Sequence, residues 1–216
     1  MGSLSEKRER NERYKSLYSG LGKLKGRKIT LHVKQGVKPV IQAARIPFSL
    51  RSKVEEKIAE LDKLDIIERA EGPTSFVSLT VVVPKLNSSD TRLCVDMRQA
   101  NEAIERERFP IRTIEETPLE VNGSKVFSKI DLKWGFHQLE LSEESRPITT
   151  FATHMGLYRY KRLMFGVTSA PEIYRYTIHR VLRDCEGTRN MTDDIIIHAN
   201  MTDGSRRFCP HCNRVG

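Results

Sequence analysis

The stretch Met191-Thr192-Asp193-Asp194-Ile195-Ile196-Ile197 places two adjacent carboxylates directly before three β-branched residues. Such a run of isoleucines is typical of a buried strand, so we expect the two aspartates at its start, in a turn. A third carboxylate, Asp131, follows a second strand-like stretch, Val126 to Ile130. Neighbouring carboxylates repel each other, and a fold that fixes them usually supplies a cation. Three carboxylates on adjacent strand ends could hold two Mg²⁺ ions about 4 Å apart, as in two-metal phosphoryl transfer. The alternative is a solvated turn pair, because Asp favours turns on its own account.

The net positive charge of the chain indicates a polyanionic partner, but the excess of basic residues is confined to the terminal segments. The formal net charge is +9 at pH 7 and the isoelectric point is near 9.5. Residues 1–30 carry nine Lys or Arg against three Glu, whereas residues 31–200 carry 25 basic and 24 acidic side chains. We therefore expect a basic N-terminal arm that can bind nucleic acid. The net charge of residues 31–200 does not by itself predict a nucleic-acid-binding groove, which would depend on particular residues.

Several classes of protein are disfavoured by the sequence. No apolar run approaches the roughly 18 residues of a membrane span, and the N-terminus lacks the apolar core of a secretory signal. Four cysteines in 216 residues do not make a disulfide scaffold, so we expect an intracellular protein, cytoplasmic or nuclear, with no membrane partner. The tail Cys209-Pro210-His211-Cys212 contains a single CxxC, which leaves a small zinc module as a remote alternative.

Two helices are predicted from apolar spacing. Ser49 can cap the first, whose apolar face recurs at steps of three and four residues. Ser169 and Glu172 have the spacing of a capping box for the second, with Pro171 in its first turn. The two apolar faces are Leu50, Val54, Ile58, Leu61 and Leu64 in the first helix, and Ile173, Tyr174, Thr177, Ile178, Val181, Leu182 and Cys185 in the second.

The strand signals lie between and after these helices. Residues 78–83 and 92–97 predict a hairpin, residues 126–130 predict a strand, and residues 151–158 predict a second hairpin broken by Gly156. Residues 137–141 alternate and also predict a strand. The order of helices and hairpins is a mixed α+β pattern rather than an alternating βαβ pattern.

Six sequence blocks follow one another along the chain in a characteristic order. The blocks are Arg92-Leu93-Cys94-Val95-Asp96-Met97-Arg98-Gln99-Ala100-Asn101, Phe127-Ser128-Lys129-Ile130-Asp131-Leu132-Lys133-Trp134-Gly135-Phe136-His137-Gln138, Thr149-Thr150-Phe151, Gly156-Leu157-Tyr158-Arg159-Tyr160, Phe165-Gly166-Val167-Thr168-Ser169-Ala170-Pro171 and Asp193-Asp194. In this order and spacing the chain resembles the reverse transcriptases of gypsy-type LTR retroelements. The resemblance spans roughly residues 15–200, and a lone Asp-Asp would be weak support without the other blocks. Trp134 stands where the family usually has a small residue.

This resemblance implies an α+β right-hand polymerase, with fingers and a partial palm built as an antiparallel sheet packed on helices. It also implies that the thumb of the family is absent from these 216 residues. The expected divisions are a basic flexible arm at 1–28, an N-terminal extension with fingers at 29–105, palm at 106–138, fingers at 139–168, palm with the Asp-Asp hairpin at 169–200, and an unrelated tail at 201–216.

The resemblance also implies the roles of individual residues. Asp131, Asp193 and Asp194 would be the catalytic carboxylates and the ligands of two Mg²⁺ ions, which Mn²⁺ could replace. Adjacent strand residues face opposite ways, so Asp193 and Asp194 need not do the same job, and Asp194 is expected as the lesser ligand. Magnesium keeps few protein ligands and takes the rest from phosphate and water, so these carboxylates are enough.

The remaining implied residues bind substrates. Lys85 and Arg92 would clamp the incoming triphosphate, since Arg offers a bidentate fork and Lys a point charge. Phe136 would exclude a 2′-hydroxyl, and Gly166 would let the backbone approach the nascent base pair. The full implied set is Lys85, Arg92, Leu132, Phe136, Phe165 and Gly166 for the nucleotide, with Arg98 and Asn101 on the template side; a structural hydrogen-bonding role for Asn101 is equally open.

The expected function is therefore that of an RNA-directed DNA polymerase fragment that extends a primer, on an RNA or DNA template, with dNTPs. The alternative is an inactive retroelement remnant that only binds nucleic acid. The sequence leaves the oligomeric state open.

Overall fold

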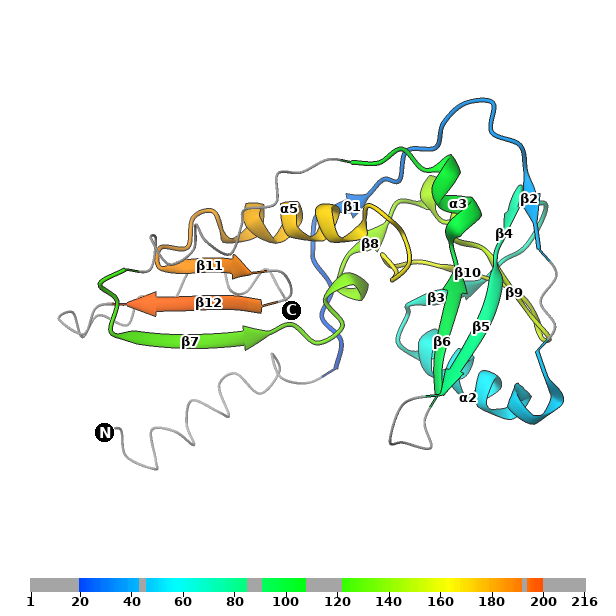
Figure 1. The fold of residues 1–216 in the computed structure, drawn as a ribbon, viewed down its shortest axis with the longest axis horizontal. Helices are drawn as coiled ribbons and strands as arrows, with labels where there is room; N and C mark the ends of the chain where they lie inside the picture. The colour runs from blue at the N-terminus through cyan, green and yellow to red at the C-terminus, as the bar shows by residue number, and fades with distance from the viewer. Residues whose placement is uncertain (1–19, 43–45, 85–90, 108–121, 192–193, 200–216) are drawn as a thin grey trace.

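The computed structural model describes residues 20–42, 46–84, 91–107, 122–191 and 194–199. Figure 1 shows two groups of elements side by side along the longest axis of the molecule. One group is built around the sheet β11–β12–β7 and the helix α5, and the other around the hairpin β5–β6 and the sheet β3–β10–β9. None of the helices in these ranges combines the length and apolar character that a membrane span requires.

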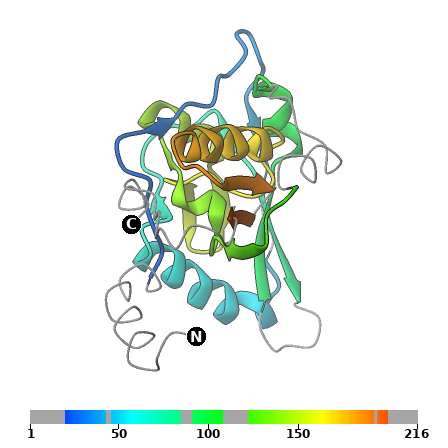
Figure 2. The ribbon, with the colours of Figure 1, turned by 90° about the vertical axis from the view of Figure 1, so that its left-hand side faces the viewer.

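The first group carries the two carboxylate stretches. Its sheet is antiparallel, with β12 in the middle between β11 and β7. Helix α5 lies over β11 when the molecule is viewed from its end (Figure 2). The bounds are β7 Val126–Asp131, α5 Ala170–Leu182, β11 Thr188–Met191 and β12 Asp194–Ala199.

The second group is larger and holds most of the β structure. Strands β5 and β6 form an antiparallel hairpin, β10 pairs with both β3 and β9, and helix α2 packs against β3 and β6. The bounds are α2 Arg51–Lys63, β3 Ile67–Arg69, β5 Leu79–Pro84, β6 Thr91–Asp96, α3 Arg98–Ala103, β9 Phe151–Thr153 and β10 Gly156–Tyr160.

Short elements complete the fold. Two pairs of two-residue strands, β1 with β8 and β2 with β4, are parallel. Four single-turn 3₁₀ helices complete the connections in the described ranges. The bounds are β1 Lys28–Ile29, β2 Val40–Ile41, β4 Phe76–Val77, β8 Glu140–Leu141, and 3₁₀ turns at Phe48–Leu50, Gly135–Gln138, Glu143–Ser145 and Pro147–Thr149.

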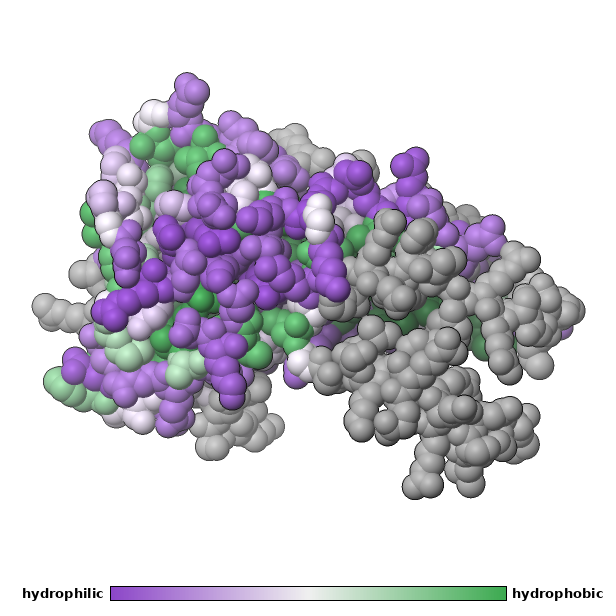
Figure 3. Space-filling view, turned by 180° about the vertical axis from the view of Figure 1, so that it is seen from behind, coloured by the Kyte–Doolittle hydropathy of each residue, from purple (hydrophilic) through white to green (hydrophobic). Residues whose placement is uncertain are grey.

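A continuous apolar core joins the two groups. Its largest fully buried hydrophobic side chains come from α2, β3, β8, β9 and the segments next to them and after β10. The face seen from behind is mostly hydrophilic, with hydrophobic patches between polar side chains (Figure 3). The largest fully buried hydrophobic side chains are Phe151, Ile66, Ile67, Leu139, Leu141, Leu163, Met164 and Val54.

The two predicted helices are confirmed, and so is Ser169 as the N-cap of the second, but the predicted cap of the first and the capping hydrogen bonds of the second are wrong. Helix α2 buries Val54, Ile58 and Leu61, but its N-cap is Leu50 because Ser49 lies in the preceding 3₁₀ turn. Helix α5 does begin after Ser169, yet the Ser169 side chain makes no capping hydrogen bond. Glu172, the other half of the predicted capping box, instead accepts a hydrogen bond from Arg106 at 3.0 Å.

Both predicted hairpins and the strand at 126–130 are also confirmed, with shifts of one or two residues. The strand predicted at 137–141 is wrong in its first half. Residues 135–138 form a 3₁₀ turn, and only Glu140 and Leu141 are in a strand.

Candidate active site

Asp131 and Asp194 lie directly opposite each other at the end of the β7–β12 pair. The register of the antiparallel ladder pairs Asp194 with Asp131, and then Ile195 with Ile130. Directly opposed residues project from the same face of a sheet, with Cβ atoms about 5 Å apart. Two carboxylates 63 positions apart in the chain therefore share one face of the sheet. Asp193, the third predicted carboxylate, lies outside the described residues.

A lysine completes this face. Lys129 is two residues before Asp131 on β7, so both side chains leave the strand on the same side. Its Nζ lies 2.7 Å from Oδ2 of Asp194. The hydrogen bond and charge of Asp194, and then the charge of Asp131, raise the pKa of Lys129. The sequence analysis missed Lys129, although the two-residue spacing from Asp131 was a signal that could have revealed it.

These groups fit a divalent metal site in part. Carboxylate oxygens are the ligands that Mg²⁺ prefers, and one or two protein carboxylates commonly suffice. The side chain of Asp131 is exposed and that of Asp194 is half-buried, so both can be reached from solvent. Within the described ranges no three His, Cys, Asp or Glu side chains gather into a metal-binding group. The two described aspartates thus supply oxygen ligands of the right kind for Mg²⁺, but not a complete metal-binding group.

An aromatic cluster follows Asp131 along the chain. The ring of Phe136 lies 4.7 Å from that of Phe165 and 5.2 Å from that of Tyr174, between ring centroids. Phe165 is 61% exposed, whereas Tyr174 is buried beneath Phe136. Residues 136 and 165, predicted to contact the nucleotide, are thus brought together by the fold. Leu132, a third, is half-buried against the core.

Gly135 is required by this cluster. A Cβ atom on Gly135 would lie 2.6 Å from Oη and 2.8 Å from Cζ of Tyr174, a separation that real Cβ atoms essentially never show. The preceding residue, Trp134, has a φ of 51°, in the left-handed region that favours glycine. The turn between Asp131 and Phe136 is therefore tightly constrained.

The segment 165–168 is seated on the corner between β6 and α3. Gly166 has a φ of +98°, and a Cβ there would lie 3.3 Å from Cγ of Met97 and 3.4 Å from the carbonyl oxygen of Val95. Asn101 of α3 makes two hydrogen bonds to this segment, one to Gly166 and one to Thr168. Both Gly166 and Asn101 were predicted as site residues, and the structure places them in contact.

The hairpin β5–β6 carries Arg92 near its turn. Arg92 is exposed, and no acidic side chain in the described part of the chain pairs with it. Lys85, its predicted companion, lies outside the described residues. Arg98, predicted on the template side, forms a bidentate pair with Asp96, in which Arg98 Nη2 lies 2.6 Å from Oδ2. These hydrogen bonds from Arg98 lower the pKa of the Asp96 carboxyl.

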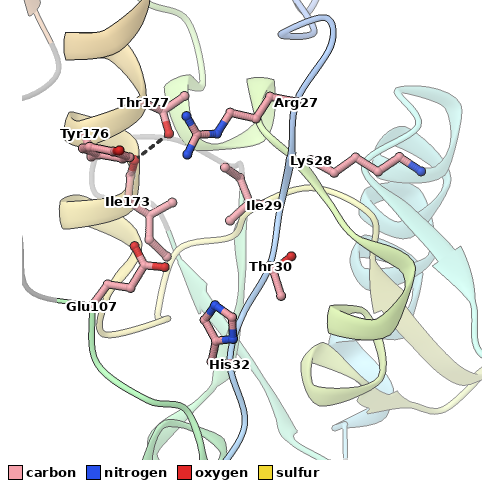
Figure 4. Close-up of a pocket in the computed structure, with 9 residues that line it drawn as sticks. All are labelled: Arg27, Lys28, Ile29, Thr30, His32, Glu107, Ile173, Tyr176 and Thr177. Atoms are coloured by element: carbon pink, nitrogen blue, oxygen red, sulfur yellow. Dashed lines mark hydrogen bonds between the residues drawn. The ribbon is translucent and has the colours of Figure 1, made fainter.

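A separate cavity of about 190 Å³ lies between residues 27–32 and helix α5, and none of the predicted site residues lines it (Figure 4). Arg27 lies over the ring of Tyr176 at 5.3 Å from its centroid, and Glu107 faces the same space. The cavity mixes basic and acidic groups, so it has no charge pattern that selects one ligand.

The family assignment follows from comparison of the sequence with known proteins. Residues 83–214 match the family model described as reverse transcriptase (RNA-dependent DNA polymerase). The match includes β6, the aromatic cluster and the carboxylate strands. It also runs into residues 201–214, which the sequence analysis set apart as an unrelated tail.

Curated relatives of the chain are retrovirus-related Pol polyproteins of Drosophila melanogaster transposons. The polyprotein from transposon 412 is 35% identical over 136 residues, which cover 61% of this chain and 11% of that polyprotein. The polyprotein from transposon gypsy is 32% identical over 163 residues, which cover 72% of this chain and 16% of that polyprotein. The chain therefore spans a small part of the length of these relatives.

Solved structures show the same fold. The prototype foamy virus protease–reverse transcriptase superposes with a TM-score of 0.77 at 18% identity, over 91% of this chain and 26% of that one. The foamy viral enzyme in complex with an RNA/DNA hybrid gives a TM-score of 0.75 at 19% identity, over 93% of this chain and 28% of that one. The α+β polymerase fold with fingers and palm is therefore confirmed.

The chain belongs to the reverse transcriptase (RNA-dependent DNA polymerase) family. Within that family, its relatives place it as a reverse transcriptase domain of the kind found in the Pol polyproteins of LTR retrotransposons.

Proposed function

We propose that this chain supplies the fingers and part of the palm of an RNA-directed DNA polymerase, which extends a primer with dNTPs by two-metal phosphoryl transfer. The observation that carries the proposal is the register of β7 and β12, which sets Asp131 opposite Asp194 on an accessible face of the sheet. In this proposal residues 29–105 and 139–168 make the fingers, and residues 106–138 and 169–200 make the palm.

The carboxylates would hold two Mg²⁺ ions, or Mn²⁺ in their place. Asp131 and Asp193 are assigned as ligands of both ions, with Asp194 beside them. When bound, such a pair of ions activates the primer 3′-hydroxyl and neutralises charge on the triphosphate. The ammonium of Lys129 already contacts one oxygen of the Asp194 carboxylate. Asp194 would therefore either give up this ion pair to bind a metal ion or keep it and lie beside the metal site.

The incoming nucleotide would lie between the fingers hairpin and the aromatic cluster. Arg92 is exposed without an acidic partner in the described ranges, which leaves its guanidinium fork available to phosphate oxygens. Lys85 would add a second positive charge. Phe136 would lie under the sugar and exclude a 2′-hydroxyl, with Phe165 beside it at 4.7 Å between centroids. The nascent base pair would approach the backbone of Gly166, and Leu132 would line the same site.

The template would run past α3. Arg98 is 87% exposed despite its pair with Asp96, so its side chain can still meet a phosphate. The basic excess in residues 1–30 would add contacts to nucleic acid that depend steeply on salt. RNA or DNA template with primer, together with dNTPs, are thus the proposed partners.

Primer extension on poly(rA)·oligo(dT) with Mg²⁺ tests this function. We expect incorporation by the wild-type chain and its loss in Asp131→Asn, because a neutral amide holds Mg²⁺ poorly. The matched control is Asp62→Asn, which removes an exposed carboxylate on α2, outside the site. Full synthesis by Asp131→Asn would show that the carboxylate assignment is wrong.

A second measurement separates catalysis from binding. If neither the wild type nor the control incorporates nucleotide, the chain would be a nucleic-acid-binding remnant. Its affinity for primer–template should then fall steeply between about 50 and 200 mM salt and should not change in Asp131→Asn.

A further inference from the structure

We propose that Asn101 is a positioning residue, which fixes the segment 165–168 to the β6–α3 corner and so sets the place of Phe165 in the nucleotide site. This inference rests on the proposed function, because it concerns the geometry of that site. It replaces direct contact with the template as the role of Asn101.

Both the nitrogen and the oxygen of the Asn101 side-chain amide bind this segment. Its Nδ2 donates a hydrogen bond to the carbonyl oxygen of Gly166 at 2.8 Å. Its Oδ1 accepts a hydrogen bond from the backbone N–H of Thr168 at 2.9 Å. An amide can bridge a carbonyl and an N–H two residues apart, because it offers one donor and one acceptor side by side. Neither a carboxylate nor an aliphatic side chain can do both.

Asn101 itself is held in place. Its backbone N–H donates to the carbonyl oxygen of Met97 at 2.7 Å, within the first turn of α3. Met97 and Val95 are buried, and both touch the space where a Cβ of Gly166 would be. The segment is therefore packed on one side and hydrogen-bonded on the other, at a corner that belongs to the core.

The position of Phe165 depends on this attachment. Phe165 is 61% exposed, so core packing alone does not fix its ring. Its ring contacts are to Phe136, at 4.7 Å, and to His137, at 5.7 Å between centroids. The residue directly after it is Gly166, whose carbonyl Asn101 holds. Asn101 thus links α3, the helix that follows the Arg92 strand β6, to the segment that carries Phe165 of the aromatic pair.

The first experiment measures amide hydrogen exchange by NMR and does not need polymerase activity. In Asn101→Ala the amide of Thr168 should exchange about tenfold faster, as expected for the loss of one hydrogen bond. Asn101→Asp keeps an acceptor for Thr168 and loses the donor to Gly166, so the Thr168 amide should stay protected. Gln99→Ala is the matched control, since Gln99 is also on α3 and accepts a hydrogen bond from Gln42 at 2.8 Å, away from residues 165–168.

The second experiment measures steady-state incorporation and primer–template affinity in the same variants. Asn101→Ala and Asn101→Asp should raise KM for dNTP about tenfold, with a smaller change in kcat and with primer–template Kd unchanged. An increase in primer–template Kd without a change in Thr168 exchange would assign Asn101 to the template and overturn the proposal. Unchanged Thr168 exchange in Asn101→Ala would overturn it as well. A wild-type chain without activity would count against the proposed function, and the exchange result would still decide whether Asn101 fixes the segment.

Discussion

Gly135 offers a sharp test of how tightly the turn after Asp131 is packed. In Gly135→Ala the new Cβ would lie 2.6 Å from Oη, 2.8 Å from Cζ and 3.0 Å from Cε2 of Tyr174. Tyr174 is 2% exposed and its ring packs against Phe136, so it cannot move aside freely. Overpacking of this kind costs about 1–3 kcal/mol. For a chain of this size, about 2 kcal/mol corresponds to a fall in Tm of roughly 4–8 °C.

The assay is thermal and urea denaturation of Gly135→Ala beside Gly22→Ala. At the matched position, a Cβ on Gly22 would contact only the side chain of Gln138, no closer than 3.4 Å at Oε1. Replacing such a glycine should leave the free energy of unfolding unchanged or raise it by about 0.4–1 kcal/mol. The free energy of unfolding should therefore fall by about 1–3 kcal/mol in Gly135→Ala and should not fall in Gly22→Ala.

A double mutant identifies the cause. Tyr174→Leu removes the atoms that the new Cβ would meet, so the cost of Gly135→Ala should be smaller in the Tyr174→Leu background. We expect a coupling free energy of at least about 1 kcal/mol. A Gly135→Ala variant as stable as wild type, with no coupling to Tyr174, would refute the packing argument.

Three further predictions concern the site. Burial, reinforced by the charge of Arg162, lowers the pKa of His137, although the hydrogen bond to the Leu163 carbonyl opposes this. The contribution of neutral His137 to the free energy of unfolding should therefore be complete above about pH 6.5 and be lost as the pH falls. Urea denaturation between pH 7.5 and 5 should show a free energy of unfolding that decreases with falling pH, and His137→Gln should make this pH dependence weaker. Lys129→Met should tighten Mn²⁺ binding measured by electron paramagnetic resonance, since it removes the cation that pairs with Asp194 at 2.7 Å, whereas Lys125→Met should leave it unchanged. Phe136→Ala should raise ribonucleotide incorporation relative to deoxynucleotide by roughly tenfold or more in single-nucleotide assays, and an unchanged ratio would remove Phe136 from the sugar site.

The sequence pattern predicted helices and strands correctly where the periodic spacing of apolar residues matches the residues that are buried in the structure. The apolar stripe of α5 buries Ile173, Tyr174 and Ile178, as its spacing predicted. The strand predicted at 137–141 failed because His137 and Gln138 are both buried, so alternation in polarity did not mean alternation in exposure. Nδ1 of His137 lies 2.9 Å from the carbonyl oxygen of Leu163, a partner 26 residues away that no local rule supplies.

The helix caps failed for a similar reason. Ser169 and Glu172 have the right spacing for a capping box, but Glu172 is drawn to Arg106, 66 residues earlier in the chain. A distant guanidinium forms a charge-assisted hydrogen bond, which is stronger than the bond to a backbone N–H that the capping box would provide. The local sequence pattern predicted where α5 begins. A contact with a distant residue, Arg106, determines the hydrogen-bond partner of Glu172 in the first turn of the helix.

In the candidate site, too, local sequence pattern predicted the strands, whereas contacts between residues far apart in the chain determined which side chains meet. Strand ends and β-branched runs were enough to predict that Asp131 and the Asp-Asp pair lie on neighbouring strands. Which residue of β12 lies opposite Asp131 is a matter of register, which local sequence pattern does not supply. The observed register pairs Asp194 with Asp131, and Lys129 of β7 contacts that same Asp194 carboxylate. Because Lys129 and Asp131 leave β7 on one side, the ammonium and both carboxylates share a single face of the sheet. Asp194 therefore already has a positive partner before any metal binds, whereas the side chain of Asp131 forms no ion pair within the described ranges. In the proposed function, this difference would make the roles of the two carboxylates unequal, with Asp131 the more available ligand for Mg²⁺.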